Sequence, residues 1–225
     1  MVIRIQKSKR LPLKNKAARD VLDRLNAYLN TAEPELIYWL TRLWSRHQKA
    51  VTYAELREAI LNGYISEKVL YDWQQSYIDF VNEKLKLKWL NAAREGAKQI
   101  ESTHSGFLFD PMSQGFKSWV EEYGAQWVAN VIADAREAMS TMIMQAYSRQ
   151  WTVDELAKAI RPIIGLTKQQ AAANLKYYSH IKESLLKKEP TMRETTAKNR
   201  AKEAALKYAA KQHRQRAHTL SLIHI

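Results

Sequence analysis

The chain has no cysteine among its 225 residues. It therefore forms no disulfide, holds no metal through a thiolate and uses no cysteine nucleophile. Structural disulfides belong to oxidising compartments, so their absence fits a protein that works in a reducing one.

Glycine and proline are scarce, with six and five residues, whereas 46% of the chain is hydrophobic. Because Gly and Pro punctuate chains built from short strands and turns, their scarcity favours long helices around a packed core. No apolar run approaches the roughly 18–20 residues that a membrane span needs. The opening MVIRIQKSKR lacks the apolar stretch of a signal peptide. We therefore expect no membrane contact.

Catalytic and metal-binding patterns are also missing. The sequence contains no GxSxG, no phosphate-binding glycine loop and no HExxH, and its six histidines are scattered. His104 and Asp110 fall in the loop-like segment 101–115, where a polar hinge is the simpler interpretation. The spacing of the acidic residues indicates a solvated helix face for Glu121, Glu122, Asp134 and Glu137. We expect no enzyme, no metal and no cofactor.

What the chain does have is positive charge at its two ends. Residues 1–24 contain eight Lys or Arg and two Asp, and residues 186–225 contain ten Lys or Arg and three Glu. These ends supply the whole net charge of +13, so residues 25–185 are neutral. Basic ends suit a polyanion, either nucleic acid or an acidic protein surface, although solvated helix faces would look the same.

Apolar residues recur with helical spacing through most of the chain. We predict helices over 14–29, over 34–50 from a first-turn Pro34, over a short segment ended by Asn62-Gly63, and over 67–100 and 116–150. The two longest would be about 50 Å each. They are expected to form an antiparallel pair hinged at 101–115, with Leu85, Leu87 and Leu90 on the apolar face of the first.

Capping boxes mark several helix starts. Thr52 with Glu55 opens the short helix, and Ser66 precedes the long one. Further boxes join Thr152 to Glu155, Thr167 to Gln170 and Thr191 to Glu194. The predicted fold is mainly α: an elongated multi-helix protein with two long antiparallel helices and a C-terminal helical module. We divide it into a body at 1–150, a module at 151–219 and a non-native tail at 220–225.

Basic side chains of the last helix and of the N-terminal segment are the candidate nucleic-acid contacts. The helix lacks the interleaved aromatic residues of single-strand binders, so any contact would be with the DNA backbone and independent of sequence. The candidates are Lys198, Arg200, Lys202, Lys207, Lys211, Arg214 and Arg216 in the helix, and Arg4, Lys7, Lys9 and Arg10 near the N-terminus.

The segment LAKAIRPIIGLTKQQAAANLKYYSHI, followed by a basic spacer and AALKYAAKQHRQRAHTL, resembles the phage head morphogenesis family of Mu-like minor head proteins. Ile164, Gly165 and Leu166 match its turn, and Tyr208, Ala209, Arg216 and Ala217 match its later helix. The resemblance covers about 152–219. The family's Arg-Thr-Glu continuation is absent, and the chain ends in LSLIHI, so we expect a C-terminally truncated member.

The resemblance implies a virion structural protein that acts in head assembly at the portal vertex and aids DNA packaging or delivery. Its expected partners are phage portal and capsid proteins and the DNA backbone, with location in the virion and, during assembly, the host cytoplasm. Two alternatives remain. One is a basic helical nucleic-acid-binding protein without a virion role. The other is an enzyme that uses the 101–115 loop or a missing C-terminal part.

Overall fold

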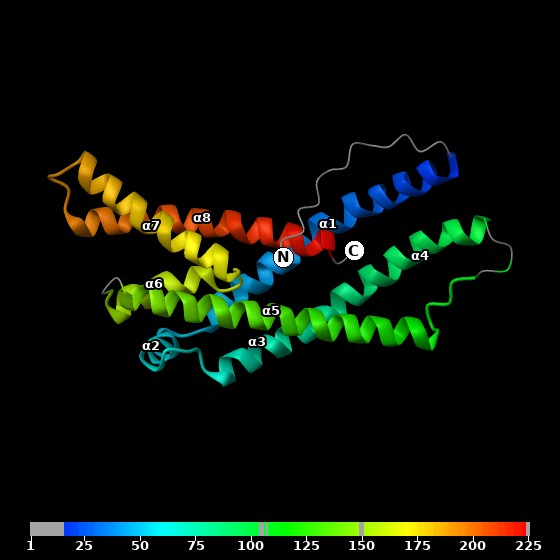
Figure 1. The fold of residues 1–225 in the computed structure, drawn as a ribbon, viewed down its shortest axis with the longest axis horizontal. Coiled ribbons are helices and arrows are strands. Elements are labelled where there is room, and N and C mark those ends of the chain that lie inside the picture. Colours follow the sequence, from blue (N-terminus) through cyan, green and yellow to red (C-terminus); the bar gives the residue numbers. More distant parts are fainter. Residues whose placement is uncertain (1–15, 104–105, 107, 149–150, 224–225) are drawn as a thin grey trace.

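The computed structural model describes residues 16–103, 106, 108–148 and 151–223, and over these residues every regular element is helical. The predicted mainly α fold is confirmed. Figure 1 shows an elongated molecule with the α4–α5 connection near one end and the α7–α8 turn at the other. The helices are α1 (Lys16–Ala50), α2 (Tyr53–Asn62), α3 (Glu67–Phe80), η1 (Val81–Leu85), α4 (Lys86–Thr103), α5 (Gln114–Ser148), α6 (Val153–Ile160), η2 (Arg161–Ile163), α7 (Lys168–Lys188) and α8 (Glu194–Ile223).

Helix α1 is continuous where the sequence predicted two helices, and Pro34 lies inside it rather than at a start. A proline in a helix interior removes one N–H and crowds the carbonyl four residues before it, which costs about 3 kcal/mol. Asn30 and Pro34 are both exposed, so water can solvate that carbonyl. The core contacts of Ala32 and Leu36, 1% and 0% exposed, hold both halves of α1 in line.

The two long antiparallel helices are confirmed. Helices α3, η1 and α4 run on without a break, and α5 returns beside them (Figure 1). Segment η1 is a π-helical turn, in which the Lys86 N–H donates to the Val81 carbonyl. The extra residue in this turn shifts the buried register to Leu85 and Trp89. Leu87, predicted on the apolar face, is consequently 59% exposed.

Helix α5 comes close to the π-helical turn at Gly124. A Cβ atom on Gly124 would lie 2.9 Å from Val81 Cγ1, and the Trp89 ring is next to it. The missing side chain therefore allows the two long helices to approach each other at this point.

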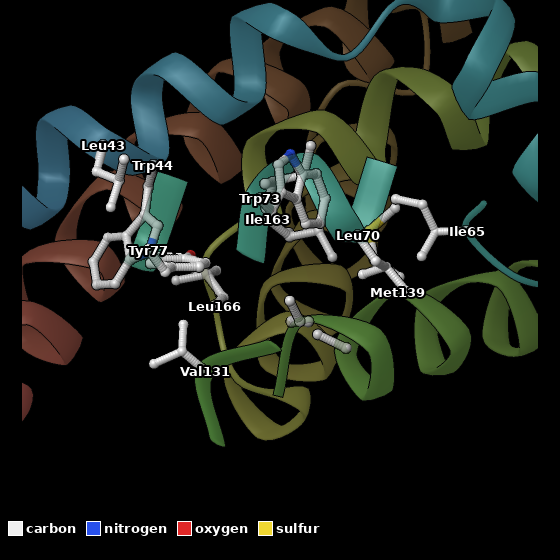
Figure 2. Close-up of a cluster of buried hydrophobic side chains, with 14 of the residues drawn as sticks. Leu43, Trp44, Ile65, Leu70, Trp73, Tyr77, Val131, Met139, Ile163 and Leu166 are labelled. Atoms are coloured by element: carbon white, nitrogen blue, oxygen red, sulfur yellow. Dashed lines mark hydrogen bonds between the residues drawn. The ribbon is translucent and has the colours of Figure 1, made fainter. Parts of the chain in front are cut away.

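One hydrophobic core joins the predicted body to the predicted module. Figure 2 shows Trp44 of α1, Tyr77 of α3, Val131 of α5 and Leu166 of the α6–α7 turn side by side. Within it the Trp44 Nε1–H donates to the Tyr77 hydroxyl at 2.9 Å. Helix α6 packs on α2, α7 on α5, and α8 on both α7 and α1. The predicted boundary at 150/151 therefore does not separate two cores.

Most of the predicted helix starts are confirmed. The boxes Thr52–Glu55, Thr152–Glu155 and Thr167–Gln170 have both reciprocal hydrogen bonds, and Ser66 caps α3. The box at 191–194 is wrong. Thr191 lies in a turn closed by the Met192 N–H on the Glu189 carbonyl. The Glu194 carboxylate, which would have to reach back to Thr191, contacts Lys182 and Lys198 instead.

Helix α8 is longer than predicted. It continues past Arg216 to Ile223; Leu220 packs against the core, and Ser221 is 1% exposed. Packing against the core therefore continues beyond Thr219, where the sequence predicted that a non-native tail begins. Residues 224–225 lie outside the described residues.

Candidate nucleic-acid interface

Small side chains at four-residue spacing determine which side of α8 is buried. Ala197, Ala201, Ala205 and Ala209 are each at most 7% exposed, and the buried line continues through His213 and Ala217. This side packs against α7 and α1. Alanine is small, so α8 lies close to its neighbouring helices along this line. The position of each lysine or arginine relative to the line therefore determines whether its side chain faces the protein or solvent.

Four of the seven candidates in α8 fall on the opposite side. At about 100° per residue, they lie within an arc of about 60° and span about 21 Å. All four are exposed. We call this set the α8 basic stripe: Arg200, Lys207, Lys211 and Arg214.

The charges of the stripe are largely free to bind an anion. Lys207, Lys211 and Arg214 have no ion-pair partner in the part of the chain that the structure describes, and Arg200 lies 3.9 Å from Glu189, with both side chains more than half exposed. One acidic residue, the exposed Glu203, shares this side of the helix. Tyr208, the nearest aromatic residue, packs on Tyr177 with ring centroids 4.6 Å apart. The stripe can therefore contact phosphates but offers no stacking platform for bases.

Lys198 is committed to contacts inside the protein. Its Nζ lies 2.6 Å from a Glu155 oxygen and 3.3 Å from a Glu194 oxygen. The hydrogen bond from Lys198 and that from the Thr152 backbone lower the pKa of Glu155. Lys202 is exposed but faces away from the stripe, toward a groove between α6, α7 and α8.

Arg216 is not on the surface, and its assignment as a nucleic-acid contact is corrected. The residue is 4% exposed. Its guanidinium donates to the Gly165 carbonyl and, at 2.8 Å, to the Asp134 carboxylate, and it lies over the Trp44 ring at 5.5 Å. Burial lowers the pKa of Arg216, an effect that Tyr77 and Asp134 oppose. A group held in this way cannot reach a phosphate.

The N-terminal candidates, Arg4, Lys7, Lys9 and Arg10, lie outside the described residues. Their contribution to a polyanion-binding surface stays a prediction. Of the loop candidates, His104 also lies outside, and Asp110 accepts hydrogen bonds from Met112 and Ser113 within its own turn.

The turn at Ile164, Gly165 and Leu166 is the centre of a buried polar network. His213 Nε2 lies 2.9 Å from the Ile164 carbonyl oxygen, and the Gln48 amide donates to the same oxygen at 3.2 Å. All three residues of the turn are buried. The turn therefore joins α1 and α8 through its backbone carbonyls.

Sequence reasoning missed the Arg216–Asp134 pair, since 82 positions separate its members. It assigned Asp134 to a solvated face. The one available signal was the register of α8, because Arg216 falls beside the buried line through Ala205 and Ala209.

Comparison of the chain with protein-family models, with curated proteins and with solved structures finds no match. Among the described residues, no three His, Asp or Glu side chains gather in a way that could hold a metal ion. None of the described helices is both long and apolar enough to cross a bilayer.

Proposed function

We propose that the chain is a phage minor head protein, a virion structural component that acts in head assembly at the portal vertex. Its partners would be portal and capsid proteins, with a secondary contact to the DNA backbone during packaging or delivery. It would be found in the virion and, during assembly, in the host cytoplasm. This role is one of binding and positioning and needs no catalytic group.

The observation that carries the proposal is where the residues of the family resemblance lie. Gly165 of the turn and Arg216 of the later helix are 51 positions apart, and the Arg216 guanidinium donates to the Gly165 carbonyl. Ile164, Leu166, Ala209 and Ala217 are buried around this contact. Residues that were matched as separate stretches of sequence thus meet in one packed unit, as a shared structural module requires.

The test is whether the chain is present in assembled particles. Phage particles from the source of the gene would be purified on a density gradient, and their proteins identified by mass spectrometry. We expect the chain in few copies per particle and, after mild disruption, in the fraction that contains the portal. Purified particles that contain portal but lack the chain would contradict the proposal.

The α8 basic stripe supports a second candidate function, nucleic-acid binding without a virion role. Both candidates predict weak binding that does not depend on DNA sequence, because phosphate contacts carry no sequence information. They differ in the importance of the DNA contact. In the first candidate it accompanies protein assembly, and in the second it is the whole function.

Fluorescence anisotropy on two unrelated duplexes at several salt concentrations tests the DNA contact. Log affinity should fall linearly with log salt. Changing all four stripe residues to Gln should reduce that slope by up to about 3.6, at about 0.9 for each phosphate that the variant no longer neutralises. The matched control changes the same number of charges elsewhere, at the exposed Lys49, Lys68, Lys117 and Lys176.

Equal slopes for the stripe variant and the scattered variant would exclude a role for the stripe and leave only net charge. Tight, salt-sensitive binding by a chain that is absent from particles would favour the second candidate. A chain that associates only with particles that contain portal would favour the first candidate.

A further inference from the structure

A groove on the other side of α8 from the basic stripe has the features of a small-molecule site. It lies between α6, α7 and α8 and encloses about 430 Å³. Pockets that bind small ligands have volumes of about 300–1,000 Å³ and mostly apolar walls with a few polar groups. We call it the α6–α8 groove.

The surface of the groove is mostly apolar, with polar side chains such as Asn174 and Asn199 among those that line it. Met142 and Leu175, each 1% exposed, lie behind this surface, and Leu206, 41% exposed, is one of the side chains that a ligand could touch. Trp151 and Tyr178 meet edge to face along one wall, with ring centroids 5.2 Å apart. This surface suits an apolar chain or ring.

Positive charge rims this apolar surface. Lys158 and Lys202 line the groove, are exposed and have no ion-pair partner among the described residues. The groove's one acidic side chain, Glu155, is paired with Lys198 at 2.6 Å. Two unpaired ammonium groups next to an apolar cavity complement a ligand with a negative head group, and partial exclusion of water strengthens the attraction.

We propose that the α6–α8 groove binds a small anionic amphiphile, an apolar chain or ring that ends in a carboxylate. The apolar part lies against Trp151, Tyr178 and Leu206. The carboxylate lies between Lys158 and Lys202. Since the basic stripe faces the opposite side of α8, this site does not depend on the proposed DNA contact.

Calorimetric titration of the full chain tests the proposal with two probes of equal chain length, dodecanoate and dodecyltrimethylammonium, both below micelle formation. Dodecanoate is expected to bind saturably at one site, and the cationic probe at least about tenfold more weakly. The double change Lys158→Gln with Lys202→Gln should weaken dodecanoate binding by about tenfold. Ala159→Trp should abolish it, because Ala159 lines the groove and the indole would fill it.

The control is Lys68→Gln with Lys117→Gln, which removes the same charge from exposed positions outside the groove and outside the α8 basic stripe, and it should leave the affinity unchanged. Melting temperatures check that each variant folds. The two lysine variants change only exposed side chains, so the test does not depend on whether Ala159→Trp folds. Absence of saturable dodecanoate binding, equal affinity for both probes, or equal effects of the two lysine variants would overturn the proposal. So would an acidic helical peptide that binds the groove when dodecanoate does not, since the site would then serve a protein partner.

Discussion

At the scale of single residues, Gly165 combines a left-handed backbone conformation with close packing against a buried side chain. Its φ is +93°, and a Cβ atom there would lie 2.5 Å from Trp44 Cγ. Gly165→Ala combines left-handed backbone strain with a clash against a buried indole, so we expect the free energy of unfolding to fall by about 3 kcal/mol.

Urea denaturation measures this loss, and Gly96 in α4 supplies the matched control. A Cβ at Gly96 would meet nothing within 4 Å. Gly96→Ala should therefore raise stability by about 0.5–1 kcal/mol, as alanine does in a helix interior. Equal effects of the two substitutions would show that Trp44 does not pack on the turn.

His47 links the core to pH. It is 4% exposed, its ring stacks on Trp73 and meets Tyr77 edge-on, and neither ring nitrogen has a hydrogen-bond partner among the described residues. Burial, with a smaller contribution from Arg46, lowers the pKa of His47 from 6.5 to about 4. Between pH 6.5 and 4 the folded chain therefore holds this histidine neutral, whereas the unfolded chain protonates it.

The stability from the neutral His47 is complete above pH 6.5 and is lost as the pH falls toward 4, by about 3 kcal/mol in all at 1.36 kcal/mol per pKa unit. Burial also lowers the pKa of His213, which adds a loss of the same sign. Carboxyls with lowered pKa, such as those of Glu55 and Glu155, add their own loss only below about pH 4.5.

His47→Phe should flatten the stability curve between pH 6.5 and 4.5 in urea denaturation, whereas the exposed His180→Ala should not. An unchanged curve for His47→Phe would contradict the assignment.

At the scale of helices, the structure at the end of α8 differs from what the sequence predicted. The sequence alone predicted a non-native tail at 220–225, because these residues interrupt a family-like motif, and such a tail could be removed without effect. In the structure Leu220 packs on the core and Ser221 is buried, with its hydroxyl donating to the His218 carbonyl.

Deletion of residues 220–225 is therefore expected to lower the melting temperature by several degrees, at about 2–4 °C for each kcal/mol in a chain of this size. Deleting only residues 224–225 is the comparison, measured by circular dichroism. If the chain without residues 220–225 melted at the same temperature as the full-length chain, these residues would be a dispensable tail, as the sequence predicted.

At the scale of the whole molecule, the core extends through both predicted domains. Helix α8 packs on α1, and Trp44 of α1 lies against the turn between α6 and α7. Neither residues 1–150 nor residues 151–225 can then bury their apolar surface alone. We expect the full chain to unfold in one cooperative transition, with far-UV and near-UV circular dichroism curves that coincide. Two separate transitions would support independent domains.

The sequence by itself determined where most helices begin and end. Capping at Thr52, Thr152 and Thr167 uses side chains three residues apart, and hydrophobic periodicity repeats within a turn, so both signals are local. It also identified the basic residues of α8 as a group. It failed where local signals compete with distant contacts, as at Pro34 inside α1 and at Glu194, which binds two lysines instead of closing a box.

Only the tertiary structure decided which of those basic residues face solvent. The seven basic side chains of α8 look equivalent in sequence, but packing against α7 and α1 places four on an open stripe and turns Lys202 toward the groove. It also directs Lys198 to Glu155 and buries Arg216 on Gly165 and Asp134. The physical reason is that a buried charge needs a partner. For Arg216 that partner is Asp134 of α5, which lies 82 positions earlier in the chain. A local pattern can place a charge on a helix, but only the neighbouring helices determine whether it meets water, a carboxylate or a ligand.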